Sequence, residues 1–384
     1  MKKLLLCLSL ATMIFTGCSD DDDDNGGNVF EGDQLQGSII EDISLDPAVT
    51  YTLVGKVEVK SGATLTIPAG TTIKGKGGAT AFSQYILVEQ GGKIMAEGTS
   101  SKPIRFTSSA ASPKSGDWGG LIINGYAPIS GASAGTTGST EIDASKPYGG
   151  TNASDNSGVI KYVILEYTGA QSTENIEHNG LTLNAVGSGT TIENIYVVSS
   201  GDDGVEFFGG SVNVTNILVV NEDDDMFDCT QGWTGTLKNG YGIWLAGHTS
   251  TEADPRGIEA DGNFDGLYPT HIGQSNFKIQ DVTIVNNSSF TMTDIAKIRR
   301  GATATITNAL AKNGTAGDGI DLTDGAGNAN NATSINMTIT NVTYAGSGIQ
   351  IHQPSTPVGT ITVAAGNTGA NTSVFSWTGF SFPN

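Results

Sequence analysis

The chain has 384 residues, of which 37% are hydrophobic and only 7% aromatic, and 53 of them are glycine. This composition is unusual for a globule with a thick core and suits a thin core with frequent turns. The formal net charge of −20 argues against binding to nucleic acid or to anionic lipid surfaces, and any polyanionic glycan would need a bridging cation.

The N-terminal residues are typical of an exported lipoprotein. Lys2 and Lys3 precede an apolar stretch, residues 4–15, which has the length of a signal peptide and is short for a membrane span. The sequence FTGC at residues 15–18 resembles a lipobox. Residues 1–17 are therefore interpreted as a lipoprotein signal peptide and Cys18 as the lipidated first residue of the mature chain. The alternative is an ordinary signal peptide with a cysteine there by chance.

An acidic run (20–24) and the sequence NGGN (25–28) follow, so residues 18–32 are expected to form a tether. The acidic run also resembles the signal that sends some Gram-negative lipoproteins to the outer face of the outer membrane. We expect a surface-exposed outer-membrane lipoprotein that touches the membrane only through its lipid. Cys229 is the one cysteine left outside the signal peptide and the lipidation site, so no internal disulfide is expected.

The rest of the chain is built from short β-rich runs that repeat. Residues 192–198 align with residues 214–220, and the same offset of 22 residues places residues 203–207 over residues 225–229. In each copy of the second unit the third and fifth residues are apolar or small, so they should face inward while the fourth faces outward. This pattern predicts an all-β fold over residues 33–384: a single-stranded right-handed parallel β-helix of about 22 residues per coil, with loop insertions. A monomer is expected.

Several segments resemble the opening coils of right-handed parallel β-helix surface proteins, which share the pectin-lyase-like architecture. The most specific of them lie at residues 62–107 and at the sequence WGGL, residues 118–121. The resemblance implies the fold and says little about activity. Residues 131–158 are expected to form a long loop that leaves the solenoid, and residues 377–382 to cap its far end.

The aligned repeats place one outward column of side chains along the rod, in which Glu206 and Asp228 should lie about 4.8 Å apart. Asp203 and Asp225 should stack just before them. Because clustered carboxylates are ligands for hard cations, we predict a Ca²⁺ site at Asp203, Glu206, Asp225 and Asp228. The alternatives are a solvated acidic face and a set of catalytic carboxylates. The full column is expected to be Thr182, Glu206, Asp228, Glu259, Lys297, Asp321 and Gln350.

Aromatic residues in the irregular region 230–275 give a second candidate site. Trp233, Tyr241 and Trp244 could stack on sugar rings beside Glu259 and Asp261, and Tyr268 lies in the same region. The alternative is that these rings cover the core beneath inserted loops.

The function expected from these features is binding of an extracellular polysaccharide or another surface partner, assisted by Ca²⁺. The alternative is a polysaccharide lyase or glycoside hydrolase of the β-helix type, and a passive structural adhesin is a third reading. The sequence DDG at residues 202–204 resembles the double Asp of polygalacturonases, but their Gly-His-Gly and Arg-Ile-Lys elements are missing. His248, Arg256 and His271 are the nearby base candidates, whereas Lys297 is interpreted as a charge-neutralising member of the column.

Overall fold

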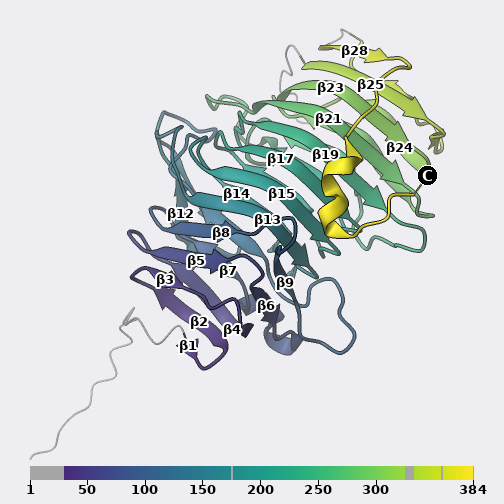
Figure 1. Cartoon of the computed structure of the whole chain (residues 1–384). Coiled ribbons are helices and arrows are strands. Elements are labelled where there is room, and N and C mark those ends of the chain that lie inside the picture. The colour runs from purple at the N-terminus through teal and green to yellow at the C-terminus, as the bar shows by residue number, and fades with distance from the viewer. Residues whose placement is uncertain (1–29, 174–175, 325–332, 356–357, 384) are drawn as a thin grey trace, which may run out of the picture.

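The computed structural model describes residues 30–173, 176–324, 333–355 and 358–383. The predicted signal peptide, the lipidated Cys18 and most of the predicted tether lie outside the described residues. The strands wind into one long parallel sheet, which makes the chain a right-handed parallel β-helix and confirms the predicted fold (Figure 1). Within the described ranges, no helix has the length and apolar character needed to cross a membrane.

One column of strands forms what we call the site face. Most of its strands have four residues or fewer. From the N-terminal end it contains β2 (Gln34–Ile39), β4 (Thr50–Val59), β7 (Ile86–Val88), β10 (Leu121–Asn124), β14 (Leu181–Asn184), β16 (Val205–Phe208), β18 (Phe227–Thr230), β20 (Ile258–Asp261), β22 (Thr291–Arg299), β24 (Thr315–Asp321), β26 (Thr343–Tyr344) and β27 (Ile351–His352).

The remaining parallel strands cover the other two sides of the coil, and from β13 onward one bent strand spans both sides. They are β3 (Ile43–Ser44), β5 (Thr64–Pro68), β6 (Thr72–Gly75), β8 (Lys93–Glu97), β9 (Ile104–Ser108), β13 (Gly158–Glu166), β15 (Thr191–Val198), β17 (Asn213–Val220), β19 (Thr236–Trp244), β21 (Asn276–Asn286), β23 (Thr303–Lys312), β25 (Thr333–Thr340) and β28 (Gly359–Val363). At the N-terminal end β1 (Phe30–Glu31) pairs antiparallel with β2, and the 3₁₀ helix η1 (Gly78–Ser83) precedes β7.

Each bend in the long strands is made by a residue in the left-handed region. Asn194, Asn216 and Asn239 have φ of 58°, 59° and 60°, a conformation that asparagine tolerates better than most residues. Their amides form a ladder, because Nδ2 of Asn216 donates to Asn194 Oδ1 at 3.0 Å and Nδ2 of Asn239 donates to Asn216 Oδ1 at 2.9 Å. The ladder satisfies polar groups where the strand turns and keeps successive coils in register.

The core is a single apolar column inside the coils, as the repeat predicts. Val205, Phe207 and Phe227 are fully buried, as are Cys229 and Ile258. The residues between them on the site face point outward. The register of the repeat at 22 residues is confirmed, since Ile192 pairs with Val214 and Glu206 pairs with Asp228.

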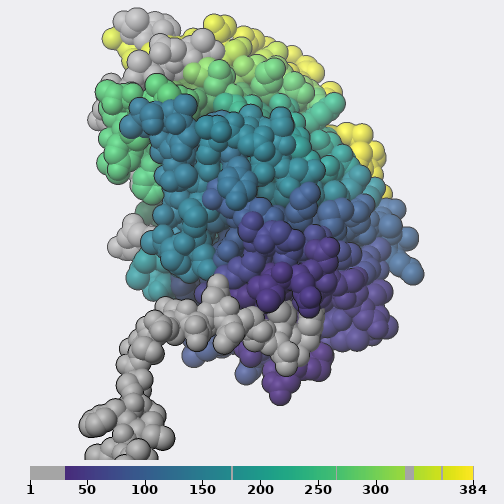
Figure 2. Space-filling model, turned by 90° about the vertical axis from the view of Figure 1, so that its left-hand side faces the viewer, coloured from purple at the N-terminus to yellow at the C-terminus, as the bar shows by residue number. Residues whose placement is uncertain are grey.

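The structure refines one sequence-based expectation and corrects another. Residues 131–158, predicted as a long loop that leaves the solenoid, contain an antiparallel hairpin, β11 (Thr137–Thr140) and β12 (Asp143–Gly149), which forms a sheet of its own. Residues 377–382 do not cap the far end. The C-terminal segment runs back along the side of the solenoid, where the 3₁₀ helix η3 (Thr372–Thr378) lies beside the middle coils (Figure 1). In Figure 2 its yellow atoms lie at the right edge against green and teal coils.

The reason for this return is an apolar outer surface that the middle coils present. Leu218 and Tyr241 are covered by the C-terminal segment, whose Phe375 is fully buried. The ring of Phe382 packs edge-on against Tyr241 at 4.8 Å between centroids. A soluble solenoid cannot leave such a surface open, so the segment acts as a lateral cover.

Candidate functional site

The outward column of the site face follows the predicted register over most of its length. Thr182, Glu206, Asp228, Glu259, Lys297 and Asp321 are successive Cα partners in the parallel ladder. The last predicted member was wrong: Asp321 pairs with His352 and not with Gln350. Extra residues in the turn through Gly346 and Gly348 shift the register there.

The four predicted metal ligands lie on β16, β18 and the turns before them, where they fall into two groups that share Asp228. Ligand oxygens of Asp203, Glu206 and Asp228 lie within 4.8 Å of one another, and so do those of Asp225, Asp228 and Glu259. Asp203, Asp225 and Asp228 are buried, with 6%, 3% and 9% of their surface exposed. A third group, which shares Asp203, contains Asp202 and Asp224.

One oxygen of each turn residue has a structural partner. Asp203 Oδ1 accepts the backbone N–H of Asp225 at 2.9 Å, and Asp225 Oδ1 accepts the N–H of Arg256 at 2.6 Å. Nδ2 of Asn179 donates to Glu206 Oε2 at 2.6 Å. By contrast, Asp228 Oδ1 is buried and has no hydrogen-bond partner among the described residues. A buried carboxylate oxygen without a partner is costly, so it points to a missing proton or cation.

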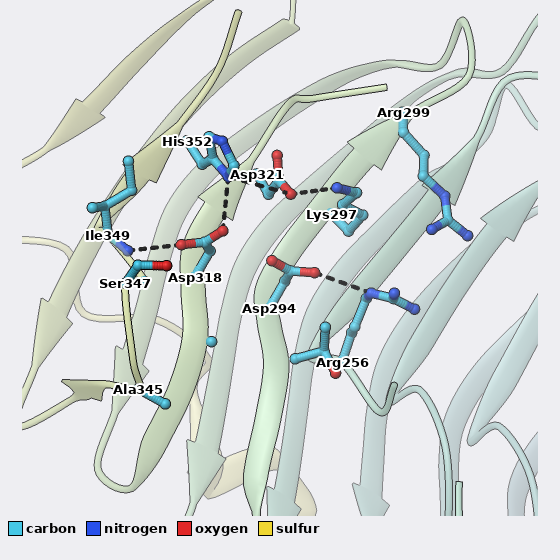
Figure 3. A pocket seen from close by; sticks show the side chains of 13 residues that line it. Arg256, Asp294, Lys297, Arg299, Asp318, Asp321, Ala345, Ser347, Ile349 and His352 are labelled. Carbon is cyan, nitrogen blue, oxygen red and sulfur yellow. Dashed lines mark hydrogen bonds and ion pairs between the residues drawn. The ribbon is translucent and has the colours of Figure 1, made fainter. Parts of the chain in front are cut away.

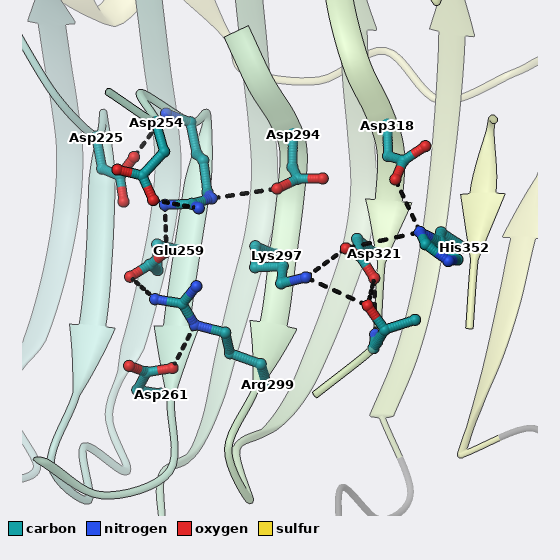
Figure 4. A network of polar contacts seen from close by, with 12 residues as sticks. Asp225, Asp254, Glu259, Asp261, Asp294, Lys297, Arg299, Asp318, Asp321 and His352 are labelled. Atoms are coloured by element: carbon teal, nitrogen blue, oxygen red, sulfur yellow. Dashed lines mark hydrogen bonds and ion pairs between the residues drawn. The ribbon is translucent and has the colours of Figure 1, made fainter. Parts of the chain in front are cut away.

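The acidic cluster has no cation of its own, whereas the next coils do. No ion pair joins Asp203, Glu206, Asp225 or Asp228 to a basic side chain in the described part of the chain. One coil further on, Glu259 pairs with Arg256 Nη1 at 2.5 Å and with Arg299 Nη2 at 2.7 Å. The carboxylates of this next coil, Glu259 and Asp261, are thus neutralised by arginines (Figure 4).

The neutralised part continues along the face. Asp261 pairs with Arg299 Nε at 2.9 Å and with Arg300 Nη1 at 2.7 Å. Arg256 Nε also contacts Asp294 Oδ2 at 3.1 Å, and Lys297 pairs with Asp321. The interpretation of Lys297 as a neutralising member of the column agrees with this contact.

The electrostatics of the two parts differ accordingly. Burial raises the pKa of Asp203, Glu206, Asp225 and Asp228 well above the usual range, and neighbouring carboxylates add to the effect. Arg256 partly opposes the rise at Asp225, and a hydrogen bond with Glu206 partly opposes it at Asp228. For Asp321, burial works to raise the pKa, but hydrogen bonds from Lys297 and Thr323 hold it below the usual value. The acidic cluster thus needs protons or a cation, while Asp321 is stably ionised.

A cavity of about 510 Å³ opens on the neutralised part of the site face. Arg256, Asp294 and Lys297 form one wall, and Asp318 and His352 form the other (Figure 3). His352 Nδ1 lies 2.8 Å from Asp318 Oδ2, and its side chain is 45% exposed. A carboxylate beside Nδ1 fixes the orientation of the ring, which is what a histidine acting as a base requires.

Sequence reasoning missed most of this cavity. His352 and Asp318 were not candidates, although Asp321 was predicted as a member of the outward column. His352 could have been identified from the sequence only if the register of β27 in the ladder had been predicted correctly. Two of the base candidates predicted from the sequence already contact other protein groups. Arg256 is held in ion pairs, and His248 Nε2 lies 2.9 Å from Glu222 O.

The prediction that Trp233, Tyr241 and Trp244 bind sugar was wrong. Trp233 is fully buried between Phe207 and Phe277, with ring centroids at 4.0 and 5.2 Å. Trp244 is also fully buried and donates to Glu222 O, and Tyr241 lies under the C-terminal segment. These rings complete the core, which was the alternative reading. Glu259 and Asp261 do face the site but are occupied by arginines.

The fold and this charged outer column define a right-handed parallel β-helix protein with a polar face along its axis. A family model described as a pectate-lyase-like β-helix domain matches residues 37–380, and the chain belongs to that family. The predicted resemblance is thereby confirmed. Neither the comparison with curated proteins nor that with solved structures finds a match.

Proposed function

We propose that this protein is an exported, lipid-anchored protein of the outer-membrane surface that binds an extracellular anionic glycan through calcium on the site face. The observation that carries the proposal is the unneutralised cluster of Asp203, Glu206, Asp225 and Asp228, with the unpartnered Asp228 Oδ1 inside it. The family, named for polysaccharide lyases, supports a role in glycan handling.

Calcium fits this cluster for chemical reasons. The donors are all carboxylate oxygens from two adjacent coils, and Ca²⁺ takes six to eight oxygen ligands with flexible geometry. Two like charges no more than 4.8 Å apart repel by at least about 3.5 kcal/mol at an effective dielectric constant of about 20. A divalent cation would remove that repulsion and leave coordination positions for ligands other than the protein. A uronate carboxylate of a glycan is such a ligand, and it could not otherwise approach a chain of charge −20.

Thermal melting of the wild-type protein with calcium and with EDTA tests the cation. Calcium is expected to raise the melting temperature, since it binds only the folded cluster. The Asp228→Asn variant should be more stable than the wild type in EDTA, by about 1–3 kcal/mol, because one repelling charge is gone. It should gain little from calcium. Asp42→Asn, at an exposed position outside the cluster, is the control. Identical wild-type curves in calcium and EDTA would rule out the site.

Binding of the glycan is tested separately. Oligogalacturonate, titrated calorimetrically into the full mature protein, should bind with calcium and not with EDTA, and Asp228→Asn should abolish the difference. Binding that survives EDTA unchanged would contradict calcium bridging. Binding without appearance of new reducing ends or unsaturated uronates favours a binding protein.

The cavity around His352 supports a second candidate, a polysaccharide lyase or hydrolase. A histidine oriented by Asp318 could remove a proton from a substrate held in the cavity or deliver one to it. If a glycan panel reveals turnover, His352→Gln should lower kcat by about 10²–10⁴-fold with little change in KM. His248→Gln, a substitution outside the cavity, is the control. A turnover that His352→Gln leaves intact would contradict this role.

A further inference from the structure

A second cavity lies beside the site face and differs from it in chemistry. Its volume is about 280 Å³, and it opens between the β11–β12 hairpin and the loop of residues 262–275. This loop contains the 3₁₀ helix η2 (Phe264–Gly266). Neither the acidic cluster nor the cavity around His352 contributes a lining residue.

The walls of this cavity are tied together by backbone contacts. Gly131 and Ile272 exchange two hydrogen bonds, at 3.1 and 2.9 Å, which join the hairpin segment to the loop. The N–H of Ser130 donates to Gln231 O at 2.8 Å, and the Tyr148 hydroxyl donates to Gln231 Oε1 at 2.6 Å. The cavity is therefore a preformed site between segments that are far apart in sequence.

The lining carries no Asp, Glu, Lys or Arg, in a chain whose net charge is −20. The polar residues Ser130, Thr136, Thr137, Ser139 and Gln231 line the cavity together with aromatic residues. A charged ligand would find no counter-ion here. An uncharged ligand with several hydroxyl groups would find both donors and acceptors.

Aromatic side chains stand open at the rim. Phe264 and Tyr268 are 41% and 45% exposed, and the ring of Tyr268 lies parallel to that of His271 at 4.5 Å with an interplanar angle of 5°. An exposed aromatic pair beside hydroxyl groups offers an apolar surface and hydrogen bonds to one ligand. A pyranose ring presents that combination, with C–H groups on its faces and hydroxyls on its edge.

One buried group in the wall lacks a partner. Ser130 is 3% exposed, and its Oγ forms no hydrogen bond within the described residues. A buried hydroxyl without a partner favours a polar neighbour, and Ser130 is one of the residues that line the cavity.

We propose that this cavity binds a neutral sugar unit, with the Tyr268 ring against one face of the pyranose and Ser130 and Gln231 at its hydroxyls. The site goes beyond the calcium-dependent site, because it requires neither a metal ion nor charge on the ligand. The chain would then bring two glycan sites of different chemistry to one side of the solenoid.

Calorimetric titration of the full mature protein in EDTA tests this site. The probes are neutral tetrasaccharides of glucose, mannose, galactose and xylose. At least one should bind the wild type, Tyr268→Ala should weaken that binding about tenfold, and Ser130→Ala, which changes one atom, about threefold. Tyr126→Ala, at another exposed tyrosine outside the cavity, is the matched control.

Two results would overturn the proposal: no binding of any of the four saccharides to the wild type, or binding that Tyr268→Ala and Ser130→Ala both leave unchanged. Melting curves in EDTA check that each variant is folded. If Tyr268→Ala does not fold, the result for Ser130→Ala decides the test. Because calcium is absent throughout, failure here leaves the calcium-dependent binding of oligogalacturonate to be judged by its own titration.

Discussion

At the scale of single residues, the carboxylates on the stacked strands of the site face have two kinds of surroundings, with and without basic partners. Glu259 and Asp261 are held by Arg256, Arg299 and Arg300, and such pairs need nothing further. Asp228, one coil earlier in the same column, has neither a basic partner among the described residues nor a hydrogen bond to Oδ1. The difference lies in which side chains follow in the next coil of the column.

His178 gives a prediction about pH at this scale. Its ring is 1% exposed, packs against Phe82 and Tyr85, and has Nε2 at 2.9 Å from Phe82 O. Burial lowers the pKa of His178 to about 4, whereas a histidine in an unfolded chain titrates near pH 6.5. Between these values the unfolded state binds more protons. The stability contribution of the neutral ring is therefore complete above about pH 6.5 and is lost as the pH falls towards 4, by up to about 3 kcal/mol.

Urea denaturation of the wild type and of His178→Gln between pH 7 and pH 4.5 measures this contribution. The variant should be less stable at pH 7, and the gap should narrow as the pH falls. The acidic cluster is common to both proteins, so its titration cancels in the comparison. A gap that stays constant over the whole range would contradict the assignment.

At the scale of elements, the asparagine bends hold the coils in register, and Asn216 is their central member. Asn216→Ala removes two amide hydrogen bonds and places alanine at φ 59°, so it should cost about 2–3 kcal/mol of unfolding free energy. Asn216→Gly removes the same bonds without the backbone strain and should cost about 1 kcal/mol less. Chemical denaturation distinguishes the two, and equal losses would show that the left-handed backbone contributes nothing.

The C-terminal segment is the second element with a testable role. Phe375 is fully buried against the outer side of the middle coils, and Asn371 N donates to Asn239 Oδ1 at 2.6 Å. Phe375→Ala should cost about 3–5 kcal/mol and expose residues 366–383 to limited proteolysis. Val374→Ala, which removes less buried surface, is the control. A variant as resistant to protease as the wild type would mean that the segment is held by its polar contacts alone.

Much of the architecture could be predicted because the repeat encodes it locally. The alternation in residues 203–207 and 225–229 sets inward and outward positions, and their offset of 22 residues sets the register, so the convergence of Asp203, Glu206 and Asp228 followed. Where a turn adds residues, as before β27, that reasoning loses the register and His352 was missed.

Burial of side chains outside the repeat could not be predicted in the same way. Trp233 and Trp244 lie in a region with no aligned copy, and a lone aromatic residue fits either a core or a binding platform. The run ILVV at residues 217–220 did carry a signal, since a strand apolar on both faces must be covered on both. That signal accounts for the lateral position of the C-terminal segment.

At the scale of the whole molecule, the column of the site face sets a length for the ligand proposed above. From Asp228 the column runs through Glu259, Lys297 and Asp321 to His352, which is four strand spacings or about 19 Å. A pyranose unit in an extended chain is about as long as one spacing. An anionic glycan anchored by calcium at Asp228 would therefore reach the cavity around His352 with its fourth or fifth unit.

The affinity for oligogalacturonates in calcium should consequently rise with chain length up to about five units and then level off. The reason is that each added unit reaches another coil until the column ends at His352. Titration of fragments of two to seven units measures this dependence. Lys297→Met should reduce the gain in affinity with length among the longer fragments. It should leave the affinity for the dimer unchanged, because the dimer does not extend past Glu259. An affinity independent of length would mean that the ligand contacts only the acidic cluster and that the cavity around His352 takes no part in glycan binding.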